Sequence, residues 1–174
     1  RKRQEFLLSL GAAVVTAGLI TLLGHWQISS SIQHQRDRND LLTREIAAHL
    51  ADVAKSLEAA GHAAETVAGF LTRCLFSMFA EDVGLLPKAG DGSGGFVGLL
   101  KRYRDAPATL HKMIAVLWAD MDRGGFSAAL AQDLLRFNGK LFKGAGADGY
   151  VLPLSTTQID GLLRAASANW QEVE

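Results

Sequence analysis

The strongest constraint on the fold is a wide apolar stripe at helical spacing between Ala63 and Ala80. Apolar side chains recur there every three to four residues, at Val67, Phe70, Leu71, Cys74, Leu75, Met78 and Phe79. A stripe of this width is typical of a helix that is covered by other helices. We therefore expect this helix to lie at the centre of the core.

The same spacing predicts helices over most of the chain. They are expected at residues 41–60, 96–103, 107–122 and 126–137, with a last helix capped by Thr156 or Thr157. Gly61 is a suitable helix stop, Pro107 suits a first helical turn, and Gly124 with Gly125 would end a helix. No stretch alternates as a strand would. The expected class is all-α, a single multi-helix bundle with an irregular or short hairpin segment near 137–154.

The length and charge of the chain limit its organisation. A chain of 174 residues suffices for one domain with a real core. Its 18 basic and 18 acidic residues cancel, so any contact with nucleic acid would need a local patch. The single cysteine, Cys74, excludes an internal disulfide. We expect residues 1–40 to form an apolar helix and polar linker, and residues 41–174 to form the helical domain.

The stretch from Phe6 to Trp26 contains no Asp, Glu, Lys or Arg and follows the basic residues "RKR". It is long enough to span a hydrocarbon core of about 30 Å. It could equally be a helix buried against protein. If it crossed a membrane, the basic residues ahead of it would tend to stay cytoplasmic, and residues 27–174 would lie on the far side. Both interpretations are open from the residues alone.

Two adjacent acids, Glu81 and Asp82, follow the apolar stripe and pose the question of a catalytic pair or a structural joint. Neighbouring helical residues do not face each other, so these carboxylates would not converge on one substrate atom. The helix macrodipole also disfavours acids at a C-terminal end. We expect a joint in which Asp82 caps the following turn and Glu81 pairs with a base such as Arg73 or Arg102. A role beside DNA or another domain is the alternative.

Three common catalytic or nucleotide-binding motifs are missing from the sequence. It contains no phosphate-binding G-x-x-x-x-G-K-[ST] loop, no G-x-S-x-G nucleophile motif and no zinc-binding H-E-x-x-H helix. The run from Gly90 to Gly95 formally fits G-x-G-x-x-G, but no strand precedes it, so we expect a flexible connector. The basic run "KRYR" offers candidate contacts to a DNA backbone, and a solvated helix face is the alternative. These candidates are Lys101, Arg102 and Arg104.

Several segments occur together in a recognisable order. They are "REIAAHLADVAKSLEAAGH", "VAGFLTRCLFSMFAEDVGLLP", "FNGKLF", "LPL" and "LLRAASANWQEVE". In this order they resemble the helical, or helicase-like, spacer domain of Mme-type fused restriction-modification enzymes and related N6-adenine DNA methyltransferases. The resemblance covers about residues 41–174. Its structural signature residues are Phe79, Glu81, Asp82, Leu85, Pro87, Phe137, Asn138, Gly139 and Phe142.

The resemblance implies an architectural function. In such polypeptides a nuclease region precedes the spacer, and a methyltransferase that uses S-adenosylmethionine follows it. No catalytic, cofactor-binding or metal-binding residue is carried over to this chain. The resemblance also implies that Phe79, Val83, Leu85 and Leu86 are buried and that the acids fix a bend. Lys140 departs from the pattern, because relatives commonly carry a second glycine there.

The expected role is therefore a non-catalytic connector between the nuclease and methyltransferase regions, cytoplasmic, with DNA as a partner of the parent chain. S-adenosylmethionine, and Mg²⁺ where a nuclease is present, belong to that parent. The resemblance favours a buried helix at Phe6 to Trp26, because a membrane span would place the domain away from DNA. The rival hypothesis is a membrane-anchored helical interaction domain.

Overall fold

The computed structural model describes residues 43–87, 94–137, 139–144 and 150–167. The chain divides into two units, Arg1–Leu41 and Leu42–Glu174, and all described residues belong to the second. The predicted apolar helix from Phe6 to Trp26 lies outside the described residues. Within the described ranges, none of the helices combines the length and the apolar content that crossing a bilayer requires.

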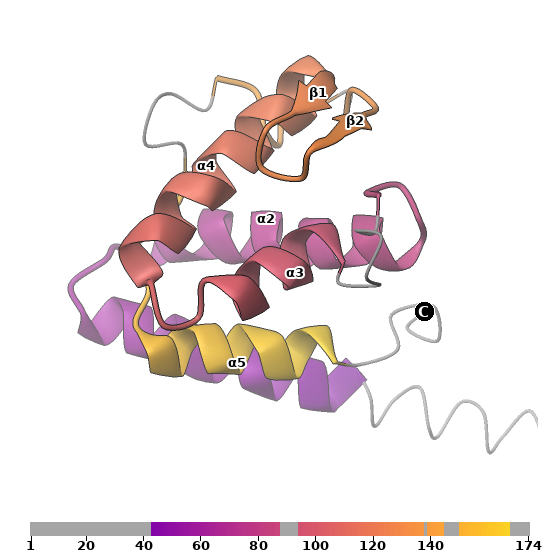
Figure 1. The fold of residues 1–174 in the computed structure, drawn as a ribbon. Coiled ribbons are helices and arrows are strands. Elements are labelled where there is room, and N and C mark those ends of the chain that lie inside the picture. Colours follow the sequence, from indigo (N-terminus) through magenta and orange to yellow (C-terminus); the bar gives the residue numbers. More distant parts are fainter. Residues whose placement is uncertain (1–42, 88–93, 138, 145–149, 168–174) are drawn as a thin grey trace, which may run out of the picture. The chain divides into compact units, whose positions relative to one another are not determined.

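The described residues form helices and one small sheet, so the predicted all-α class is confirmed (Figure 1). Residues 43–59 are helical. Four further helices follow: α2 (Ala64–Asp82), α3 (Gly95–Arg102), α4 (Pro107–Arg123) and α5 (Thr156–Ala166). The short helix α3 packs against α2, α4 and α5. It is therefore the element that ties these three longer helices into one core.

The predicted start and stop signals act as expected at most helix ends. Gly61 has a φ of 98° just after the helix of residues 43–59, and Gly124 has a φ of 73° just after α4. Pro107 is the first residue of α4. The cap of α5 differs from the prediction: Ser155, not Thr156 or Thr157, accepts a hydrogen bond from the Gln158 amide in a capping box. The capping box decides between these hydroxyls because Gln158 lies three residues after Ser155.

The helix predicted at residues 126–137 is wrong. An antiparallel hairpin stands there, with β1 (Gly125–Ser127) paired to β2 (Gln132–Leu134) in the register Gly125↔Leu134 and Ser127↔Gln132. Positive φ values at Gly124, Gly125 and Ala131 turn the backbone in a way that a helix does not allow. Leu134 is buried, whereas Phe126 is exposed. The hairpin thus lies before the 137–154 region, where residues 139–144 and 150–155 are irregular.

The core is centred on Trp118 of α4. Its ring lies 5.8 Å from that of Phe70, 6.5 Å from that of Phe96 and 6.0 Å from that of Phe142, measured between centroids. Its indole Nε1 donates a 3.0 Å hydrogen bond to the buried Ser77 Oγ. The ring therefore joins α2, α3 and the segment around Phe142, and its one polar atom is satisfied.

Cys74 lies in the buried face of α2, and burial raises the pKa of its thiol. We expect the native thiol to react with iodoacetamide far more slowly than the thiol of the urea-unfolded chain. An opening that costs about 3 kcal/mol would slow alkylation about 100-fold. Mass spectrometry of timed samples measures both rates. Equal rates in the two states would contradict the buried position.

Candidate functional site

The carboxylate of Glu81 is a structural joint between two helices. Its Oε2 accepts hydrogen bonds from the amides of Phe96, at 2.8 Å, and of Val97, at 2.9 Å. Glu81 is the second-last residue of α2 and is only 7% exposed, while Phe96 and Val97 lie in the first turn of α3. An anionic acceptor at a helix N-terminus satisfies amides that the helix itself cannot pair. The carboxylate of one helix thus caps the next.

The glycines that begin α3 make room for this cap. A Cβ placed on Gly94, the N-cap residue of α3, would overlap the Glu81 carboxylate. A Cβ on Gly95 would approach Leu130 Cδ1 at 3.0 Å and the Pro87 carbonyl oxygen at 3.2 Å. The last two glycines of the predicted flexible connector therefore have a packing role, and the residues before them, 88–93, lie outside the described residues.

The bend after α2 is closed by backbone hydrogen bonds. The amides of Leu85 and Leu86 both donate to the Ala80 carbonyl, at 2.7 and 2.9 Å, and Gly84 has a φ of 77°. This arrangement is a common way to satisfy the last carbonyls of a helix. Arg73, one of the bases predicted to pair with Glu81, points elsewhere: it donates to the carbonyls of Leu141 and Gly69. The partners found for Glu81 are amides rather than this base.

The predicted burial of the signature is wrong for three of its four apolar residues. Leu86 is fully buried, but Phe79, Val83 and Leu85 are each between 41% and 44% exposed. Glu81 and Met78 face the core instead, so the side of α2 that carries Phe79 is turned outward. Of the other signature residues, Phe142 is buried, Phe137 is half-buried, and Asn138 lies outside the described residues.

The three predicted DNA-contacting residues differ in their surroundings. Lys101 and Arg102 are exposed in the last turn of α3. Arg104 is paired with Asp160 of α5 through two hydrogen bonds, Nε to Oδ1 at 2.6 Å and Nη2 to Oδ2 at 2.7 Å. A third bond joins Arg104 Nη1 to Asp105 Oδ1 at 2.9 Å. Arg104 therefore holds the turn after α3 to α5.

This ion pair makes a pH-dependent contribution to stability. The hydrogen bonds from Arg104 lower the pKa of Asp160 below its ordinary value of 3.8. The stabilisation is therefore present above that value and is lost as pH falls through the lower, folded-state pKa. We expect Asp160→Asn to lower the melting temperature at pH 7, and the difference from wild type to shrink below pH 3.8.

Circular dichroism melts at several pH values would measure this difference. Asp105→Asn is the matched control, because the Asp105 side chain is 85% exposed and accepts one bond from the same arginine. Its melting temperature should stay close to that of wild type. A loss for Asp160→Asn that is equal at pH 7 and pH 3 would contradict the assignment.

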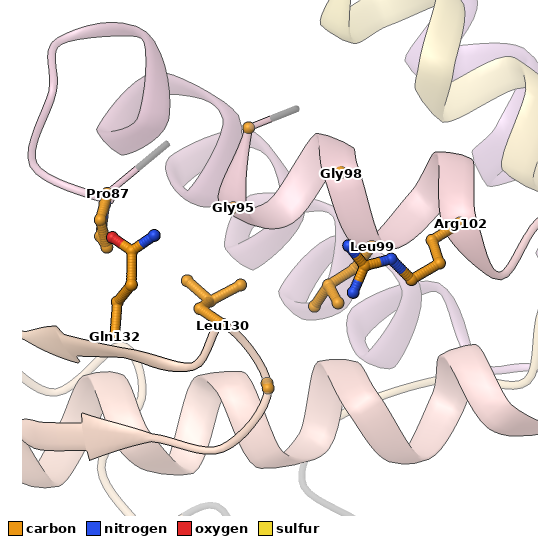
Figure 2. Close-up of a pocket in the computed structure, with 9 residues that line it drawn as sticks. Pro87, Gly95, Gly98, Leu99, Arg102, Leu130 and Gln132 are labelled. Atoms are coloured by element: carbon orange, nitrogen blue, oxygen red, sulfur yellow. The ribbon is translucent and has the colours of Figure 1, made fainter. Parts of the chain in front are cut away.

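A small cavity lies between α3 and the hairpin (Figure 2). Its volume is about 30 Å³, and its lining includes Gly95, Gly98, Leu130, Gln132 and the side chain of Arg102. Pockets for organic ligands are about ten times larger or more. A second cleft, of about 80 Å³, lies between the helix of residues 43–59 and α5. Neither cavity has the volume of a substrate site.

Metal-binding geometry is likewise missing from the described part of the chain, where no three His, Cys, Asp or Glu side chains gather. His49 is half-exposed, with its Nε2 3.8 Å from Glu45 Oε1. These statements concern the residues that the structure describes. His25 and His34 lie outside them.

The pairing of Glu81 with α3 and the contacts of Arg73 were not predicted from the sequence. The guanidinium of Arg73 lies over the ring of Tyr150, 3.5 Å from its centroid, in addition to its bonds to two carbonyls. Only the pairing of Glu81 with α3 has a signal in the sequence, because α3 begins at glycines, which offer no side-chain cap. Such a helix needs its cap from a distant residue.

The comparisons with known proteins agree with the motifs. The family model described as "MmeI, helicase spacer domain" matches residues 65–142. This segment contains the Glu81 joint, the hairpin and the "FNGKLF" motif. Searches of the curated proteins and of the solved structures found no significant match. Over residues 65–142 the chain therefore matches the family of MmeI helicase spacer domains, and the resemblance predicted from its motifs is confirmed.

Proposed function

We propose that this domain is a non-catalytic helical connector within a restriction-modification polypeptide. The observation that carries the proposal is the spacer-family match over residues 65–142. The Glu81 joint supports it, because the carboxylate that stood out in the sequence is used in capping α3. In this function the partners are a nuclease region and an adenine methyltransferase region of the same chain. S-adenosylmethionine and, where a nuclease is present, Mg²⁺ are bound by those regions.

The gene itself gives the first test. We expect the reading frame to continue beyond the codon of Glu174 into a cofactor-binding motif and an N-P-P-Y type string. A preparation of the present chain alone, supplied with S-adenosylmethionine and Mg²⁺, should neither methylate nor cleave DNA. Either activity in the isolated chain would overturn the connector function.

We also propose that Lys101 and Arg102 contact a DNA backbone in the parent protein. Both side chains are exposed on neighbouring positions of α3, whereas Arg104 is held by Asp160. Contacts of this kind strengthen binding to all sequences alike and weaken with added salt. The proposal therefore concerns affinity, and it leaves the choice of recognition sequence to other regions.

Charge reversal in the parent protein tests this contact. Lys101→Glu with Arg102→Glu should weaken binding to unrelated DNA sequences equally and reduce the salt dependence of binding. Lys55→Glu is the control, because Lys55 is an exposed base on the helix of residues 43–59. If both variants bind DNA like wild type, Lys101 and Arg102 belong to a solvated helix face, which is the alternative that the sequence left open.

A further inference from the structure

The helix of residues 43–59 and α5 lie side by side and run in opposite directions (Figure 1). Near the start of α5, Gln158 Nε2 donates a 2.9 Å hydrogen bond to Ser56 Oγ. Further along α5, a Cβ on Gly161 would meet Val53 Cγ2. Residue numbers thus fall along one helix as they rise along the other. The two contacts together, Ser56 with Gln158 and Val53 with Gly161, fix the antiparallel direction of the pair.

A cleft between these two helices is lined by residues that lie further along the same helix pair. His49 and Asp52 line it from the first helix, and Thr157 and Arg164 line it from α5. The pairing therefore continues towards the residues at which the chain enters the first helix and leaves α5. In consequence, the start of the first helix and the end of α5 lie at the same end of the helix pair (Figure 1).

The two helices are packed as one body. Val53 and Leu57 of the first helix and Ile159 and Leu162 of α5 belong to the same hydrophobic core, and each is at most 3% exposed. The close approach at Gly161 leaves no room for a side chain there. Separating the helices would expose these apolar side chains to water, which is unfavourable. The start of the first helix and the end of α5 therefore remain next to each other.

We propose that the chain enters and leaves this domain at one end of the helix pair, so that the domain acts as a clasp on its two connections. A rod that separates two regions by its own length needs its entry and exit at opposite ends. Along the sequence, α2, α3, α4 and the hairpin are inserted between these two helices. Such an insertion is compatible with helix ends that lie close together. The identity of the flanking regions rests on the proposed function, whereas the clasp geometry does not.

Cross-linking in the parent protein tests the clasp. Glu45 is exposed and continues the line of His49 and Asp52 along the first helix, and Ser167 is exposed directly after α5. A short bismaleimide should join Glu45→Cys to Ser167→Cys in the native protein. The control pair, Glu45→Cys with Thr157→Cys, places the second thiol at the opposite end of α5 and should not react. The buried Cys74 does not compete.

The cross-linked parent should methylate DNA without loss of activity, because the clasp never opens. Failure of the first pair to react, or equal reaction of the control pair, would overturn the geometry. Loss of methylation on cross-linking, restored with a cleavable reagent, would show that the helices must separate and would overturn the clasp. A parent without methyltransferase activity before cross-linking would instead overturn the proposed function, while the cross-link pattern still decides the geometry.

Discussion

Replacing Trp118 by alanine should destabilise the domain by about 3–5 kcal/mol, the usual cost of removing a buried tryptophan. Trp118 is fully buried, contacts the rings of Phe70, Phe96 and Phe142, and joins three segments of the fold. The cavity would open where α2, α3 and α4 meet, so the neighbouring rings could close it only by moving whole helices. Urea unfolding followed by circular dichroism measures the change.

Two further variants make this prediction specific. Trp118→Phe keeps most of the ring contacts but loses the hydrogen bond to Ser77 Oγ, and should cost about 1 kcal/mol from the bond alone. Val116→Ala, on the outer face of the same helix, removes a side chain that is 38% exposed and should cost less than the tryptophan truncation. If Trp118→Ala were no more costly than Val116→Ala, the ring would not be at the centre of the core.

Removing the Glu81 cap should cost about 3 kcal/mol in Glu81→Ala, because hydrogen bonds to a charged group contribute about 1.5–3 kcal/mol each. The variant leaves the amides of Phe96 and Val97 without their carboxylate acceptor. Glu81→Gln keeps an acceptor oxygen but not the charge, and should lose roughly half as much. Urea unfolding of the purified chain measures each difference.

Gly94→Ala should have a cost similar to that of Glu81→Ala, because its Cβ would displace the same carboxylate. The double variant then costs less than the sum of the two single ones, since the carboxylate is already gone. Gly139→Ala is the matched control, as a Cβ there meets no atom within 4 Å. Additive costs for Glu81 and Gly94 would contradict the joint.

The helices could be predicted from sequence because their signals are local. The stripe over Val67, Phe70, Cys74 and Met78 lies on the buried side of α2, and Pro107 begins α4. The helix predicted at residues 126–137 failed because Gly124, Gly125 and Ala131 take positive φ values in the folded chain. A window of apolar residues that short does not distinguish a helix from a hairpin.

The candidate site was predictable in kind but not in detail. Adjacent carboxylates on a helix do not converge on one atom, which predicts a structural joint, and Glu81 forms one. Its partners could not be predicted, because they lie fifteen and sixteen residues away and depend on how α3 packs against α2. The exposure of Phe79, Val83 and Leu85 was missed for a similar reason. An apolar run shows that a helix has a buried face, but the neighbouring elements decide which residues they cover.

The sequence by itself determined the helical class, most helix ends and the family resemblance, because each depends on spacing along the chain or on short motifs. Only the tertiary structure decided which acid caps which helix and that the first helix pairs antiparallel with α5. These contacts join residues as far apart as Ser56 and Gln158. Their geometry follows from packing the whole core at once, which no local pattern encodes.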